Sequence, residues 1–211
     1  MKTYIFDLDG TLIDSMTMAW EHLLLKYLVD RNIDYPNDLI KSVITLGFAG
    51  VAKYYKEHFP IVESEKEIVA YFLKEMQVLY NERIPAKPYV LETLQILKER
   101  GASLNVLTAS PHCFLDPCLK RLGMTEYFDH LWSGEDFPTT KADPKIYKLA
   151  AERLGRKVED CVMVDDSIVA IKSAKEAGLQ TIGVYDEVSK EYENELRAVG
   201  DQYIYTFQEL Q

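Results

Sequence analysis

The feature that most constrains the fold is a regular alternation of short apolar runs and helical segments from residue 87 to the end of the chain. The helical segments, such as 89–100 and 167–178, carry apolar residues at intervals of three and four and stop at a glycine. Strands that alternate with helices over short connections form a parallel sheet with helices on both faces. We therefore predict an α/β fold with a Rossmann-like parallel sheet. The runs expected to be strands are 3–8, 103–108, 129–134, 161–166, 180–185 and 202–206.

One long stretch, residues 15–84, interrupts this alternation between the first and second expected strands. Connections in α/β units usually span about 2–6 residues around one helix, so a stretch of this length is expected to fold as a separate helical subdomain. We predict that residues 1–14 and 85–211 form the core and that 15–84 form the insertion. Its amphipathic helical stretches are 17–31, 37–59 and 64–83, with no good strand among them.

Acidic side chains gather where the expected strands end. Asp7 and Asp9 follow the first strand, and Asp165 and Asp166 follow the run "CVMV". Ligands of a parallel sheet bind at the carboxyl ends of its strands, so these four carboxylates are expected to share one site. Two carboxylates about 4 Å apart repel by about 4 kcal/mol at an effective dielectric near 20, so a positive group must lie among them. A hard divalent cation with oxygen ligands meets this need, and Mg²⁺ suits a site that also receives a phosphate.

Two simpler interpretations of the segment "FDLDGTLID" fail. A turn explains the Asp-Gly pair that ends in Gly10, but it does not explain Asp7. A calcium loop starting at Asp7 would need Gly at its sixth position and Glu at its twelfth, where this chain has Leu12 and Met18.

The segment "FDLDGTLID" resembles the first motif, DxDGT, of the haloacid dehalogenase superfamily. Three further segments are similar to the other motifs of that family and stand in the family's order: "VLTAS" at 106–110, "TKADPKIYKLAAERLG" at 140–155 and "VMVDDSIVAIKSAKEAG" at 162–178. The insertion looks like the type 1 helical cap of the family, and the resemblance spans nearly the whole chain. It implies a catalytic core over residues 1–14 and 85–211 and a cap that excludes water from a phosphoryl site.

The resemblance also implies a role for each matched residue. Asp7 is expected to be the nucleophile that forms an aspartyl phosphate, and Asp9 the acid and base that protonates the leaving group and then takes a proton from water. Thr108 and the Ala109 amide are expected to bind phosphate oxygens. Lys141 is expected to supply positive charge.

The family commonly has Pro after the lysine of its third motif, where this chain has Ala142, so Lys145 is an alternative to Lys141. Lys145 is expected in the first turn of a helix, which favours Lys141.

The implied cofactor is Mg²⁺. The resemblance places it on the Asp7 carboxylate, the Asp9 backbone carbonyl and Asp166, with Asp165 next to the ion or bound to it.

The expected reaction is Mg²⁺-dependent hydrolysis of a small phosphomonoester, as in phosphoglycolate phosphatases. Dehalogenation is disfavoured because that branch of the family lacks a second acidic residue in its first motif, and Asp9 is present. A β-phosphoglucomutase-like reaction is the alternative, but the His that this branch carries twelve residues after the nucleophile is Ala19 here, and His22 is expected to be an ordinary helix residue. A phospho-accepting receiver module is a further alternative, disfavoured by the Asp-x-Asp start and by the insertion.

Specificity is expected to come from the insertion, where segment 45–55 offers three aromatic side chains and Lys53. Lys53 is the candidate contact for a substrate carboxylate or a second anionic group. Aromatic residues on helices belong more often to a core than to a ligand site, and that is the simpler expectation for Phe48, Tyr54 and Tyr55.

Composition excludes several other classes of function. The 211 residues carry 24 Lys and Arg against 34 Asp and Glu, a net charge of −10, which argues against a general binder of nucleic acid or of anionic membranes. No stretch approaches the ~18 apolar residues of a membrane helix, and the N-terminus lacks the apolar region of a signal peptide. The three cysteines show no metal-binding spacing and suit a reducing compartment. We expect a cytoplasmic monomer or homodimer that acts on a small phosphorylated metabolite.

Overall fold

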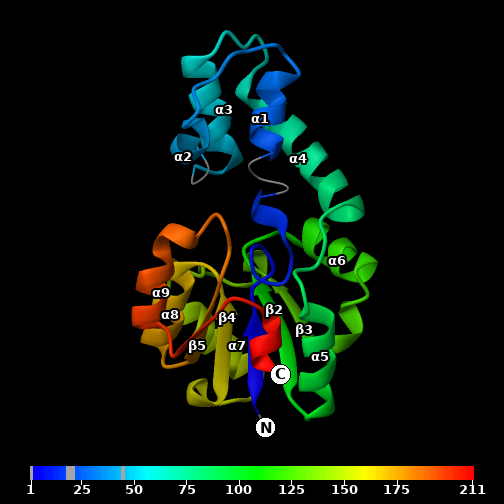
Figure 1. The fold of residues 1–211 in the computed structure, drawn as a ribbon, viewed down its shortest axis with the longest axis vertical. Helices are drawn as coiled ribbons and strands as arrows, with labels where there is room; N and C mark the ends of the chain where they lie inside the picture. Colours follow the sequence, from blue (N-terminus) through cyan, green and yellow to red (C-terminus); the bar gives the residue numbers. More distant parts are fainter. Residues whose placement is uncertain (1, 18–21, 44–45) are drawn as a thin grey trace. The chain divides into compact units, whose positions relative to one another are not determined.

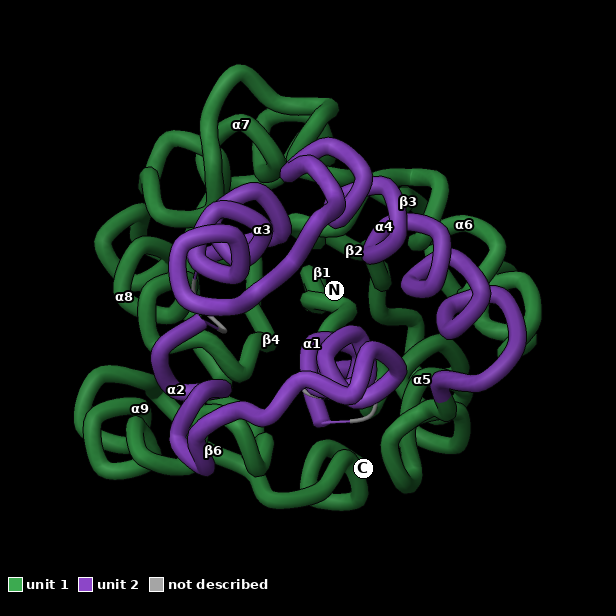
Figure 2. Tube along the Cα trace, turned by 90° about the horizontal axis from the view of Figure 1, so that it is seen from above, with its two compact units in different colours: residues 1–14, 85–211 green, residues 15–84 purple. Residues whose placement is uncertain are grey.

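The computed structural model describes residues 2–17, 22–43 and 46–211 of the chain. They form two compact units, one of residues 1–14 with 85–211 and one of residues 15–84. Figure 1 shows the helices and strands, and Figure 2 colours the first unit green and the second purple. No helix among the described residues is both long enough and apolar enough to span a bilayer.

The first unit is built on a six-stranded sheet in the order β3-β2-β1-β4-β5-β6, and every neighbouring pair is parallel (Figure 1). All six expected strands are present, so the predicted parallel α/β fold is confirmed. The central strands β1 and β4 are buried along their whole length, as expected for strands covered on both faces. The strands are β1 (Thr3–Phe6), β2 (Ser103–Thr108), β3 (His130–Ser133), β4 (Cys161–Asp165), β5 (Gln180–Val184) and β6 (Gln202–Ile204).

Helices connect the strands of the first unit, and several end as the sequence predicts. Gly101 and Gly178 adopt left-handed φ angles of 79° and 100° after α5 and α8, the conformation that glycine tolerates best at a helix end. The α-helices are α5 (Val90–Glu99), α6 (His112–Arg121), α7 (Lys145–Arg153), α8 (Ile168–Ala177) and α9 (Glu193–Val199). The 3₁₀ helices are η2 (Thr125–Tyr127), η3 (Gly134–Asp136), η4 (Val158–Asp160), η5 (Lys190–Tyr192) and η6 (Phe207–Leu210).

Side chains from both faces of the sheet are packed. On one face Ile5, Leu107 and Met163 belong to a buried cluster with residues of α7 and α8. On the other face the ring of Phe6 lies 6.2 Å from that of Phe207 in η6. Because neighbouring residues of β1 point to opposite faces, both faces are closed by apolar contacts. The ends of the strands are therefore the places left for polar side chains.

The second unit contains no strand among its described residues, and its helices are α1 (His22–Val29), α2 (Leu39–Val43), α3 (Gly47–His58) and α4 (Glu65–Glu82). The sequence predicts one helix over 37–59, and this is wrong. α2 and α3 are separate helices, and Gly47 at the start of α3 has a φ of 64°, in the left-handed region that does not continue a helix. α4 begins with a capping box between Ser64 and Glu67, which satisfies N–H groups of its first turn.

Aromatic side chains form the core of the second unit. Tyr55 is fully buried, its hydroxyl donates to the Leu24 carbonyl at 2.9 Å, and its ring lies 6.1 Å from that of Phe72. Phe48 stacks on the same Phe72 ring at 5.3 Å. These contacts explain Phe48 and Tyr55 as packing residues, as the helical pattern indicates.

Candidate active site

Asp7 lies directly after β1, at the centre of the sheet. Its backbone N–H donates to the Val164 carbonyl of β4 at 2.9 Å, which continues the strand pairing by one residue. Immediately beyond it the chain turns, and the N–H groups of Leu12 and Ile13 both donate to the Leu8 carbonyl. The Asp7 side chain is 8% exposed. The fold thus delivers a buried carboxylate to the carboxyl edge of the sheet.

Lys141 joins Asp7 to Asp165. Its Nζ lies 2.5 Å from Asp7 Oδ1 and 2.6 Å from Asp165 Oδ2, and its side chain is 13% exposed. Asp165 is also fixed from the other side, because the Ser167 N–H donates to its Oδ1 at 2.8 Å. A buried lysine between two carboxylates supplies fixed positive charge at this edge of the sheet.

Two hydrogen bonds hold the loop that carries Lys141. The Tyr147 hydroxyl of α7 donates to the Lys141 carbonyl at 3.0 Å, and Ser173 Oγ of α8 donates to the Ala142 carbonyl at 2.8 Å. The alternative lysine, Lys145, is exposed in the first turn of α7. Of the two lysines, the structure therefore brings Lys141 into the acidic cluster.

Asp166 is held by the loop that follows Asp7. Thr11 Oγ1 donates to Asp166 Oδ1 at 3.2 Å and accepts from the Asp166 N–H at 3.1 Å. Gly10 packs directly against this carboxyl group, since a Cβ on Gly10 would lie 2.6 Å from Asp166 Oδ2, and the residue has a φ of 75°. Glycine is required here for the backbone angle and for the close approach.

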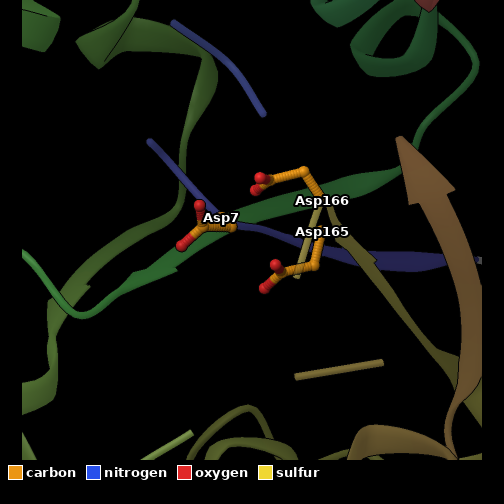
Figure 3. A group of neighbouring side chains, drawn as sticks. All are labelled: Asp7, Asp165 and Asp166. Atoms are coloured by element: carbon orange, nitrogen blue, oxygen red, sulfur yellow. The ribbon is translucent and has the colours of Figure 1, made fainter. Parts of the chain in front are cut away.

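One carboxylate oxygen from each of Asp7, Asp165 and Asp166 lies within 4.8 Å of the others, and all three side chains are buried. Figure 3 shows these carboxyl groups gathered at the ends of β1 and β4. Burial raises the pKa of Asp7 from 3.8 to about 8, against the effect of Lys141 beside it. Burial also raises the pKa of Asp166 well above its usual range, with Asp165 as a further cause. Three buried oxygen donors, of which Asp7 and Asp166 have raised pKa values, fit a hard divalent cation, whose charge would favour the ionised forms.

The charge on Lys141 responds to the same cluster. Burial by itself disfavours the ammonium, but the Asp165 and Asp7 carboxylates outweigh it and raise the Lys141 pKa above its ordinary value. Lys141 therefore stays protonated throughout the physiological range.

Asp9 is half-buried and turns toward the end of β2. Ser110 Oγ donates to Asp9 Oδ2 at 2.6 Å, and Thr108 Oγ1 donates to the same oxygen at 3.4 Å. Asp9 and Thr108, both predicted site residues, are thus neighbours, and Ala109 lies exposed between Thr108 and Ser110. The Asp9 carboxylate is not part of the group of three carboxylates.

The remaining residues singled out in the sequence belong to the second unit or lie outside the described residues. Lys53 is an exposed residue of α3 in the second unit, and its predicted contact with an anionic group stays a prediction. Ala19, the position used to judge the mutase alternative, lies outside the described residues. His22 is exposed at the start of α1.

The sequence interpretation missed one buried ion pair close to the site. Lys87 Nζ lies 2.8 Å from Asp186 Oδ2, with the side chains 13% and 2% exposed, and it donates to the Tyr185 carbonyl at 2.7 Å. The Lys87 N–H donates to the Leu12 carbonyl at 3.0 Å, so this residue ties the loop after Asp7 to the end of β5. The only sequence signal was a charged residue directly after an apolar strand.

Comparison with known proteins gives a consistent assignment. Residues 1–178 match the family model described as haloacid dehalogenase-like hydrolase. A phosphoglycolate phosphatase from Aquifex aeolicus is 31% identical over 187 residues, which cover 86% of this chain and 83% of the relative. A phosphorylated carbohydrates phosphatase from Thermotoga maritima is 28% identical over 182 residues, covering 86% and 84%. The crystal structure of a Thermotoga maritima protein provisionally assigned as a beta-phosphoglucomutase has a TM-score of 0.83 at 26% identity, covering 100% of this chain and 96% of that one.

Proposed function

The chain belongs to the haloacid dehalogenase-like hydrolase family and is a phosphatase of that family, and we propose that it hydrolyses a small phosphomonoester through an aspartyl phosphate on Asp7. The family expected from the four sequence motifs is thereby confirmed. The observation that carries the proposal is the arrangement around Lys141, whose ammonium touches Asp7 and Asp165 beside the buried Asp166. A nucleophilic carboxylate, a fixed cation and a group of oxygen ligands are the parts that phosphoryl transfer needs.

Hydrolases of this family generally use a divalent metal, and we propose Mg²⁺ here. Asp7, Asp165 and Asp166 would hold the ion, together with the Asp9 backbone carbonyl. When bound, the ion supplies positive charge that offsets the repulsion between the Asp7 carboxylate and the phosphate.

Asp7 and Asp9 divide the chemistry in the proposed reaction. A carboxylate oxygen of Asp7 forms a bond to phosphorus while the bond from phosphorus to the alkoxide breaks, and Asp9 gives its proton to the departing alkoxide. In the second step Asp9 takes a proton from water, the water oxygen bonds to phosphorus, and the bond to Asp7 breaks. Inorganic phosphate leaves, and both carboxylates return to their starting forms.

The remaining residues bind and orient the phosphate. Lys141 offers a charge close to Asp7, where the transferring group would lie, and its buried position keeps that charge from being screened by water. The Thr108 hydroxyl and the Ala109 amide, at the end of the neighbouring strand, are proposed donors to the phosphate oxygens. Lys53 remains the proposed contact for a second anionic group of the substrate.

We propose that the substrate is a small phosphomonoester of the phosphoglycolate type. The similarity to a phosphoglycolate phosphatase supports this substrate, and the similarity to a phosphatase of phosphorylated carbohydrates makes sugar phosphates the first comparison. A phosphate-release screen with Mg²⁺ over both groups of compounds tests the choice. We expect phosphoglycolate to be turned over with a higher kcat/KM than hexose phosphates, and the reverse order would move the substrate class to carbohydrates.

A mutase reaction is the alternative, favoured by the high structural similarity to the protein provisionally assigned as a beta-phosphoglucomutase. A mutase returns the phosphoryl group to a sugar, whereas a hydrolase passes it to water. With a hexose 1-phosphate we expect free phosphate in excess over isomerised sugar phosphate. Isomerised product in excess would replace the hydrolase proposal with the mutase.

The two aspartates are separated by substituting each with Asn and trapping the phosphoenzyme by rapid acid quench. Asp7→Asn has no carboxylate to attack with, so it should retain no labelled phosphate. Asp9→Asn should react normally with activated aryl phosphates in the first step, yet lose about 10²- to 10⁴-fold with alkyl phosphates, whose leaving group needs a proton. It should also accumulate phosphoenzyme, because water attack loses its base.

The matched control is Asp160→Asn, the same substitution at an exposed residue just before β4, at the opposite edge of the sheet. It should behave as wild type with both substrate types. Label retained on the Asp7→Asn protein, or equal losses for aryl and alkyl phosphates in Asp9→Asn, would show that the proposed roles are wrong.

A further inference from the structure

Ser110 is a buried residue two positions beyond the end of β2, and nothing in the proposed chemistry uses it so far. Its side chain is directed at Asp9, and the residue is 9% exposed. The Oγ donates to Asp9 Oδ2 at 2.6 Å, within the short range of hydroxyl-to-carboxylate hydrogen bonds. The two residues are 101 positions apart in the sequence, so the contact exists only in the folded chain.

Ser110 also orients Thr108. The Ser110 N–H donates to Thr108 Oγ1 at 3.0 Å, and Thr108 Oγ1 in turn donates to Asp9 Oδ2 at 3.4 Å. The second of these bonds is long and weak compared with the bond from the Ser110 hydroxyl. When the Thr108 hydroxyl turns to a bound phosphate, as proposed above, Ser110 still holds Asp9 Oδ2.

We propose that Ser110 is a positioning residue that fixes the Asp9 carboxyl group through Oδ2. The inference rests on the proposed function of Asp9 and extends it to the residue that holds this carboxyl group in one rotation. A general acid whose carboxyl group rotates among several orientations transfers its proton more slowly, because proton transfer needs the reacting atoms at hydrogen-bond distance.

The test is a double-mutant cycle with Ser110→Ala and Asp9→Asn, read by the first-turnover rate of leaving-group release. In the wild-type background we expect Ser110→Ala to slow leaving-group release from an alkyl phosphate about 10-fold or more, with KM nearly unchanged. The rate with an activated aryl phosphate should stay within about 2-fold of the wild-type rate. In the Asp9→Asn background the same substitution should have no further effect, because the Ser110 hydroxyl acts only through Asp9, and the backbone N–H that contacts Thr108 is kept in the alanine variant. Ser110→Thr keeps a hydroxyl and should recover most of the alkyl phosphate rate.

Ser133→Ala is the matched control. Ser133 is a buried serine at the end of the neighbouring strand β3, and its Oγ accepts from the Glu135 N–H, so the substitution removes a comparable hydroxyl elsewhere along the same edge of the sheet. It should not distinguish alkyl from aryl phosphates. Urea unfolding of each variant identifies any loss that is due to folding.

Three results would overturn the assignment of Ser110. The first is that Ser110→Ala lowers the rate equally with alkyl and aryl phosphates. The second is a raised KM at unchanged kcat, which would indicate a substrate contact. The third is a rate loss in the double variant that equals the product of the losses in Ser110→Ala and Asp9→Asn. A folded wild-type protein that turns over no phosphomonoester would overturn the proposed function, and this assignment with it. The two failures are therefore distinct.

Discussion

The raised pKa of Asp7 predicts that the metal-free protein loses stability as the pH rises. In the unfolded chain Asp7 titrates near its ordinary value of 3.8, whereas burial raises its pKa to about 8 in the folded protein. Between these values the unfolded chain has released a proton that the folded chain still holds, so raising the pH favours unfolding. The stabilisation is therefore complete below the unfolded pKa and is lost as the pH rises through the folded pKa.

The size of the effect follows from the shift. Each pH unit between the two pKa values lowers the free energy of unfolding by about 1.4 kcal/mol. From about pH 5 to about pH 8 it should therefore fall by about 4 kcal/mol. The Asp7 side chain is 8% exposed, so solvent screening reduces this figure little. Asp166, whose pKa burial also raises, contributes with the same sign.

Urea unfolding followed by circular dichroism, at several pH values in chelator and in excess Mg²⁺, measures the prediction. In chelator the free energy of unfolding should fall across the interval, and in Mg²⁺ the fall should disappear because the cation binds the ionised carboxylate. Asp7→Asn is the reference, since its side chain does not titrate. His112, whose pKa is raised by hydrogen bonds to Asp116 and Asp136, gives a slope of the same sign in both proteins, and the comparison cancels it.

The decisive quantity is the difference in pH slope between wild type and Asp7→Asn without metal. If the two proteins lose stability equally between about pH 5 and pH 8, Asp7 is already ionised in the folded metal-free site, and the reasoning from burial is refuted. A wild-type slope that Mg²⁺ leaves unchanged would remove Asp7 from the metal site.

Three further predictions concern the surroundings of Asp7. Asp166→Ala should raise the Mg²⁺ concentration for half-maximal activity more than Asp165→Ala, and chelator should abolish turnover; activity that persists in excess chelator would exclude the metal. Lys87→Met should lower the free energy of unfolding, measured in urea, by about 3–5 kcal/mol, because it leaves the buried Asp186 carboxylate without its ion-pair partner. Lys175→Met, at an exposed ion pair, should lower it by less than about 1 kcal/mol. Similar losses for the two variants would mean that the Lys87 pair is solvated. Gly10→Ala should lower the free energy of unfolding by at least about 1–2 kcal/mol and weaken Mg²⁺ binding in a titration, because its φ of 75° and the 2.6 Å approach to Asp166 Oδ2 both oppose a Cβ; wild-type affinity would contradict this.

Local patterns in the sequence determined the elements of the fold. The apolar runs predict all six strands, most clearly the central β1 and β4, because a strand buried on both faces needs a largely apolar run. The glycines at 101 and 178 mark the ends of two helices. The order of the four motifs indicates the family, which the comparisons confirm. The same local reasoning joined α2 and α3 into one helix, because the amphipathic spacing of the sequence continues through Gly47. The backbone of Gly47, however, has a left-handed φ that does not continue a helix.

The sequence also predicts which residues end the strands, but only the tertiary structure decided which of them meet. Asp7 and Asp9 are two residues apart, yet Asp7 faces Lys141 while Asp9 accepts from Ser110. Likewise, the partners Lys87 and Asp186 stand 99 residues apart, and their pairing depends on the loop after β1 lying beside the end of β5. Rotation of a side chain and contact between distant segments are set by the packing of the whole sheet, and no local pattern records them. The sequence by itself therefore determined the chemistry available at the carboxyl edge, and the folded chain decided how its hydrogen bonds and charges are shared.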